Sequence, residues 1–131
     1  MIQVGTIVKV SDKTGVVLGQ CIKVLGPTRK RIAFIGDLVI VTVKRLNIDR
    51  FKRIKASRRK KFILGTLHRG LVVRSKEQFC RSPGLYYTFN ENAVVLVNKK
   101  VVPISNRVYG PILRELCMKF PSLGCTSRFM I

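Results

Sequence analysis

Short apolar stretches alternate with short polar turns from residue 4 to residue 97. The apolar stretches predict strands over 4–10, 16–25, 32–35, 38–43, 71–74, 85–89 and 93–97. Gly19 is expected to mark a β-bulge, and residues 90–92 a tight turn that joins the last two strands. Many short strands joined by turns favour a mainly β fold, either a small barrel or a sandwich.

The spacing of apolar residues changes in the last third of the chain. Pro111 stands where a helix would begin, and Pro121 where it would have to end. One face of this segment is apolar and holds Leu113, Leu116, Cys117 and Phe120. The pattern predicts a short amphipathic helix that plugs the barrel or packs on its flank. The 131 residues suit a single domain, 1–131.

The charge balance points to a polyanionic partner. The chain has 26 Lys and Arg against 6 Asp and Glu, a formal net charge of +20. Such a charge destabilises the compact state unless a polyanion neutralises it, which makes nucleic acid the first expectation. An anionic membrane surface and an acidic protein come second and third. No apolar run reaches the ~18 residues of a membrane span, so no span is expected.

The cations gather in two places. Residues 29–31 form a basic tip between apolar stretches, and residues 44–61 hold ten cations with Asp49 as the only acid. We interpret 44–64 as a basic extended arm or loop that binds anions. The candidate RNA-binding residues are Lys9, Lys13, Lys23, Arg29, Lys30, Arg31, Lys44, Arg45, Arg50, Lys52, Arg53, Lys55, Arg58, Arg59, Lys60, Lys61, Arg74 and Lys76.

The residues that could carry catalysis are few and scattered. His68 is the only histidine, and we expect it to be packed or bonded to backbone. Asp12 and Asp37 are expected to shape turns, and Glu115 to pair with Arg114. No phosphate-cradling glycine motif is present. We therefore expect no enzyme activity and no catalytic residue.

The four cysteines, Cys21, Cys80, Cys117 and Cys125, lie too far apart for a close zinc pair. Buried free thiols are the interpretation, with no metal and no cofactor. Tyr86, Tyr87 and Phe89 could stack on bases, but alternation sends Tyr87 and Phe89 to one inner face, which favours core packing. The sequence thus indicates binding to RNA backbone and shape without a code for bases.

An ordered set of motifs carries a family resemblance. These are VSDKTG at 10–15, CIKVLG at 21–26, RIAFIGD at 31–37, GLVVRSK at 70–76, FNENAVVL at 89–96 and NRVYGPILREL at 106–116. Together they resemble the universal large-subunit ribosomal protein fourteen, of the bacterial and organellar type. The resemblance covers nearly the whole chain except 46–64.

The resemblance implies a five-stranded β-barrel with a basic hairpin and a C-terminal helical segment. It implies a structural role: binding to large-subunit ribosomal RNA at the face that meets the small subunit and its RNA, within an intersubunit bridge. Ribosomal proteins three and nineteen would be neighbours, and a ribosome-silencing factor could dock on the family's surface. Arg107 matches an Arg that this factor uses, Asn106 stands where the family has Thr, and Lys119 stands in for a basic residue.

Two departures shape the remaining expectations. The segment after Lys44 is longer and more basic than in the family, and the tail after Leu116 is shorter. This divergence and the lack of a presequence pattern suggest a mitochondrial ribosome, with a plastid or bacterial ribosome as the alternative. The alternative function is a free-standing RNA-binding module or RNA chaperone with an OB-like barrel.

Overall fold

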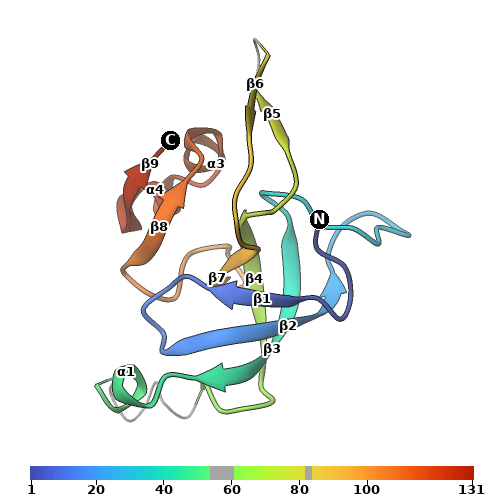
Figure 1. Cartoon of the computed structure of the whole chain (residues 1–131). Helices are drawn as coiled ribbons and strands as arrows, with labels where there is room; N and C mark the ends of the chain where they lie inside the picture. Colours follow the sequence, from blue (N-terminus) through green and yellow to red (C-terminus); the bar gives the residue numbers. More distant parts are fainter. Residues whose placement is uncertain (54–60, 82–83) are drawn as a thin grey trace.

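Five strands close a barrel in this computed structural model, which describes residues 1–53, 61–81 and 84–131. They are β1 (Ile7–Val10), β2 (Val16–Val24), β3 (Leu38–Leu46), β4 (Leu67–Arg74) and β7 (Ala93–Val97). The order is β1-β2-β3-β4-β7, and the barrel closes where β1 pairs in parallel with β7 (Figure 1). All other barrel pairs are antiparallel. The predicted mainly β fold with a five-stranded barrel is confirmed.

Strand alternation fills the barrel with small branched side chains. Val8 of β1, Val39 and Val41 of β3 and Val94 of β7 are each at most 1% exposed. We call the buried interior cluster the barrel core: Ile2, Val8, Val10, Val16, Cys21, Val24, Ala33, Val39, Val41, Val43, Phe62, Val72, Val94 and Leu96. The β2–β3 register shifts between Leu18 and Gly19, so the expected bulge is confirmed.

A second apolar cluster lies outside the barrel wall. We call it the flank core: Leu71, Val73, Ala93, Val95, Val97, Val108, Ile112, Leu113, Leu116 and Leu123. It joins the outer faces of β4 and β7 to the C-terminal segment, which lies beside the barrel in Figure 1. Strand β7 is therefore buried on both faces, as its continuous apolar run requires. The C-terminal segment packs on the flank and does not plug the barrel.

The predicted helix between Pro111 and Pro121 is partly wrong. Residues Val108–Ile112 form strand β8, which pairs in parallel with β9 (Ser127–Met130). Proline is tolerated in β8 because this is an edge strand of a sheet with only two strands. The helix α3 (Arg114–Lys119) follows, and Pro121 ends it and opens α4 (Pro121–Thr126), so the expected end is confirmed.

Two further strand predictions are corrected. Residues 32–35 form no strand. Their ladder is limited to one isolated bridge, in which Ala33 exchanges backbone hydrogen bonds with Ile2 at 3.1 and 2.8 Å. Strand β6 (Leu85–Tyr87) does not pair with β7. It pairs with β5 (Phe79–Arg81), which sequence reasoning missed, in a separate hairpin that projects from the barrel (Figure 1). Strand β7 finds its partners, β1 and β4, far away in the sequence.

The basic segment 44–64 contains a short helix. Strand β3 runs on to Leu46, and Asn47 caps α1 (Ile48–Lys52) by accepting the backbone N–H groups of Asp49 and Arg50 at 3.1 and 3.3 Å. Phe62 is 2% exposed and belongs to the barrel core, and Phe51 packs against that core. Aromatic side chains thus anchor the described part of the segment on both sides of residues 54–60.

Candidate RNA-binding surface

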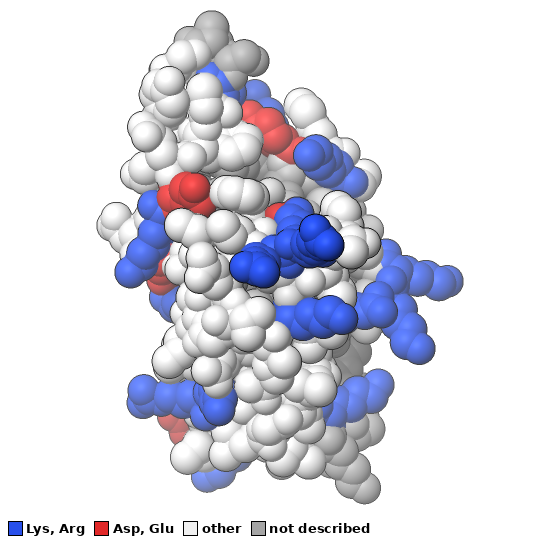
Figure 2. All heavy atoms as spheres, turned by 90° about the vertical axis from the view of Figure 1, so that its right-hand side faces the viewer, with Lys and Arg blue, Asp and Glu red and all other residues white. Residues whose placement is uncertain are grey.

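The loop between β2 and β3, residues 25–37, is the tip loop. It leaves the barrel on the right in Figure 1, and Figure 2 views that side, where blue Lys and Arg side chains spread over the surface. Arg29 and Arg31 are exposed. Lys30 turns back instead, with its Nζ 2.7 Å from Oδ2 of Asp37. The tip therefore presents two arginines and uses the third cation to hold its own shape.

Asp37 is the fixed point of the tip loop. Its Oδ2 also accepts the backbone N–H of Phe34 at 2.8 Å, so the expected turn-shaping role is confirmed. Gly26 lies directly over Lys30, since a Cβ there would come within 2.7 Å of the Lys30 Cδ. The aliphatic stem of Lys30 thus occupies the space that a side chain at residue 26 would need.

A second group of cations begins in the last residues of strand β3 and continues through α1. Its described members are exposed: Lys44, Arg45, Arg50, Lys52, Arg53 and Lys61. Four predicted residues of this group, Lys55, Arg58, Arg59 and Lys60, lie outside the described residues. Asp49 forms no ion pair in the part of the chain that the structure describes. Acidic side chains therefore leave this group of cations largely unneutralised.

Most cations of the described residues form no ion pair with an acid. Ion pairs engage only the side chains of Lys9, Lys30, Arg74 and Arg81 and the N-terminal amine within ranges 1–53, 61–81 and 84–131.

Asp12 is buried and accepts hydrogen bonds from the hydroxyl of Thr14 and from the backbone of Thr14 and Leu96. Burial raises the pKa of this carboxyl. Its predicted role in shaping a turn is confirmed.

Arg74 is a predicted RNA contact that the fold uses internally. The residue is 4% exposed, and its guanidinium donates to the carbonyl oxygens of Tyr109 and Pro111 at 3.0 and 3.1 Å. It also donates to Ser11 and, at 2.9 Å, to Glu91. Arg74 thus joins β4 to β8, and its Nη1 and Nη2 donors are engaged inside the fold, so we leave it out of the surface proposed below.

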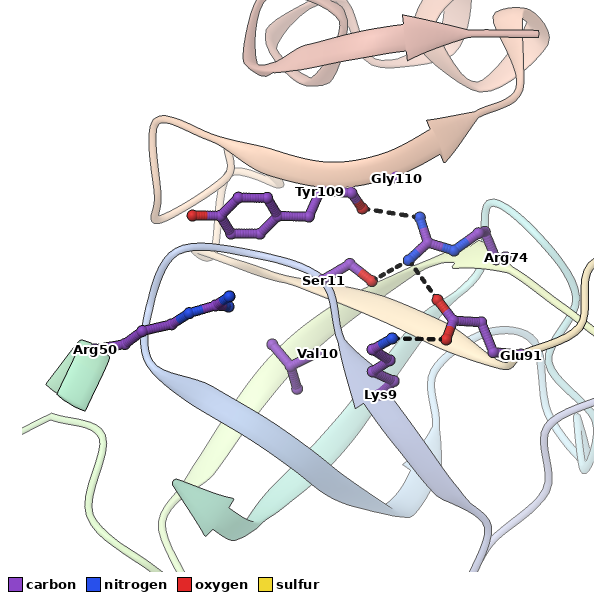
Figure 3. A pocket seen from close by; sticks show the side chains of 8 residues that line it. All are labelled: Lys9, Val10, Ser11, Arg50, Arg74, Glu91, Tyr109 and Gly110. Carbon is purple, nitrogen blue, oxygen red and sulfur yellow. Dashed lines mark hydrogen bonds and ion pairs between the residues drawn. The ribbon is translucent and has the colours of Figure 1, made fainter. Parts of the chain in front are cut away.

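The remaining predicted cations are dispersed over the barrel. Lys13, Lys23 and Lys76 are exposed, and Lys9 donates to Glu91 at 2.8 Å (Figure 3). Burial opposes the charge of Glu91, but the hydrogen bond from Lys9 and the charge of Arg74 hold the pKa of Glu91 below its ordinary value. Glu91 therefore stays ionised between the two cations.

The three residues of the expected factor-docking surface lie in two separate parts of the fold. Asn106 and Arg107 precede β8, and Lys119 ends α3. Asn106 and Lys119 are exposed, whereas Arg107 is half-buried with its guanidinium carbon 5.6 Å from the centre of the Tyr109 ring.

No arrangement of described side chains resembles a catalytic or metal centre. His68 lies 4.9 Å from the Phe62 ring, and its Nε2 is 3.0 Å from the Thr66 hydroxyl, so the prediction of a packed histidine is confirmed. Burial lowers the pKa of His68. Within the described ranges no three His, Cys, Asp or Glu side chains gather as a metal site. None of the described helices is long and apolar enough to span a membrane.

Two smaller expectations need correction. All four cysteines are free, but only Cys21 is buried, while Cys80 and Cys125 are exposed. Glu115 pairs with Arg81 of strand β5 and not with Arg114, because α3 turns this carboxylate toward the β5–β6 hairpin. Tyr87 and Phe89 pack against the flank core, which confirms the predicted inner face, and Tyr86 is exposed.

The fold and the charge define the class of small, basic proteins built on one closed five-stranded barrel. The family model of ribosomal protein L14p/L23e matches residues 1–131, and the chain belongs to this family. It is therefore a structural component of the large ribosomal subunit, with ribosomal RNA and ribosomal proteins as its partners. The family also confirms that the chain is not an enzyme.

Proposed function

We propose that this protein binds large-subunit ribosomal RNA through the phosphate groups that meet its tip loop and its basic segment 44–64. The observation that carries the proposal is a closed barrel with exposed cations that no acid neutralises in the described residues. Arg29 and Arg31 can each fork two phosphate oxygens, and Lys44 and Lys52 add point charges. The Lys30–Asp37 ion pair holds the tip loop and the Asn47 side chain caps α1, so binding costs less ordering entropy.

The family resemblance and the exposure of single side chains support finer proposals about the place of the protein in the ribosome and its neighbours. We propose that the protein lies at the subunit interface, contributes to an intersubunit bridge and contacts small-subunit ribosomal RNA. Its proposed neighbours are ribosomal proteins three and nineteen, and the exposed Asn106 and Lys119, with Arg107, form a docking surface for a silencing factor. The divergent basic segment supports a mitochondrial ribosome, with a plastid or bacterial ribosome as the alternative.

Sedimentation of native extract at rising salt tests this proposal. Counterion release makes affinity fall with a slope of roughly 0.7–0.9 per neutralised phosphate, so the chain should stay with the large subunit until high salt removes it. The double variant Arg29→Ala/Arg31→Ala is expected to dissociate at lower salt. The matched control is Lys99→Ala/Lys100→Ala, which removes the same charge from the exposed turn after β7.

The two variants separate a specific contact from general attraction. Equal dissociation of both variants would contradict a role for the tip loop. A wild-type chain that runs free at physiological salt would favour the alternative, a free-standing RNA-binding module.

A further inference from the structure

A polar cavity of about 270 Å³ lies between β1, α1 and β8. Its charged lining residues are Lys9, Arg50, Arg74 and Glu91, and Tyr109 forms an aromatic wall (Figure 3). Arg50 reaches in from α1, while Lys9 and Glu91 come from the opposite side. We call this cavity the Arg50 pocket. Residues distant in sequence build it, so only the fold brings them together.

Tyr109 positions the guanidinium of Arg50. The guanidinium carbon lies 5.1 Å from the centre of the Tyr109 ring, within the range of a cation–π contact. Among the described residues the Arg50 side chain has no hydrogen-bond acceptor and no acidic partner. Because stacking uses the face of the guanidinium, its in-plane N–H donors remain available to a ligand.

The other side of the pocket is an ordered ion network. Glu91 accepts from Lys9 at 2.8 Å and from Arg74 at 2.9 Å. The three cations and one carboxylate leave a local charge of +2. A lysine ammonium has three donors, and Glu91 takes one of those of Lys9. Lys9 therefore keeps donors for a second anion and is held in place by the first.

We propose that the Arg50 pocket binds one phosphate group of an RNA backbone, with Arg50 and Lys9 as its donors, and this rests on the RNA binding proposed above. The volume of about 270 Å³ leaves room for a phosphate together with part of its sugar. The pocket continues the basic segment 44–64, through Arg50, to the barrel surface. It thus gives that segment a specific contact in addition to its general attraction for polyanions.

Filter binding of the full chain to a large-subunit ribosomal RNA transcript, at several salt concentrations, tests the pocket. Arg50→Ala is expected to weaken binding about tenfold and to lower the salt slope by roughly 0.7–0.9, the value of one phosphate contact. The matched control is Lys99→Ala, which removes one positive charge from the exposed turn after β7, outside both the pocket and the proposed RNA-binding surface. Its expected loss is less than about threefold.

Phosphate-ethylation interference on the same RNA locates the contact. At least one phosphate whose ethylation weakens the wild-type complex should have no effect on the Arg50→Ala complex. Equal losses for Arg50→Ala and Lys99→Ala, or identical interference patterns, would overturn the pocket while wild-type binding upholds the proposed function. A wild-type chain that does not bind this RNA would overturn both.

Discussion

At the scale of single residues, Arg74 and Gly110 show how closely the barrel and its C-terminal segment fit. Arg74 donates to the carbonyl oxygens on both sides of Gly110. A Cβ on Gly110 would lie 2.7 Å from Nη1 of Arg74, and the φ of Gly110 is +86°. Glycine is therefore required here for two reasons, its left-handed backbone and its lack of a side chain.

Gly110→Ala is expected to lower the free energy of unfolding by about 2 kcal/mol, because it strains the backbone and displaces the guanidinium. Urea denaturation of the variant and the wild type measures this difference in the free energy of unfolding. The control is Gly65→Ala, since Gly65 has φ +83° but a Cβ there would meet no described heavy atom within 4 Å. Its expected loss is about 1 kcal/mol, from backbone strain alone. Equal losses would show that the contact with Arg74 contributes nothing.

At the scale of elements, one ion pair connects the β5–β6 hairpin to helix α3. Arg81 of β5 pairs with Glu115 of α3 and donates to the C-terminal carbonyl of Ile131 at 3.0 Å. It also donates to the Tyr87 hydroxyl at 2.9 Å and stacks over that ring at 4.5 Å. The hairpin lies outside the barrel sheet, so this cluster contributes to holding its orientation.

Glu115→Gln is expected to speed amide hydrogen exchange in strands β5 and β6 by roughly two- to fivefold, the effect of one partly exposed ion pair. The amide hydrogens of barrel strand β3 should exchange at the same rate in the variant and the wild type, which serves as the internal control. The hydrogen bond from Arg81 lowers the pKa of Glu115. The stabilisation is therefore present above the ordinary pKa of 4.5 and is lost as pH falls through the lowered value. A difference between variant and wild type that persists at lower pH would contradict this origin.

At the scale of the whole molecule, the net charge of +20 opposes folding in the absence of RNA. Raising NaCl from about 0.05 M to about 0.5 M shortens the Debye length to well below 10 Å and screens this repulsion. The Tm of the isolated chain is expected to rise by several degrees, as measured by circular dichroism. KCl should act equally, because screening does not depend on the cation. A Tm that falls with salt would show that local ion pairs outweigh the net repulsion.

The sequence by itself determined the five barrel strands, the excess of positive charge and the family. Residues 38–43 and 93–97 appear as buried strands because side-chain alternation and apolar runs are local properties of the chain. The charge excess is likewise a sum over residues and needs no fold. The bulge at Gly19 and the end of α3 at Pro121 follow from the backbone preferences of single residues.

Only the tertiary structure decided which elements meet and which cations remain available. Strand β7 pairs with β1 and β4, and Arg74, which looked like one more RNA contact, bonds to carbonyl oxygens 35 and 37 residues away. Lys30 turns back to Asp37, and Arg50 stacks on Tyr109. These contacts depend on packing between distant segments, which no local pattern of residues encodes.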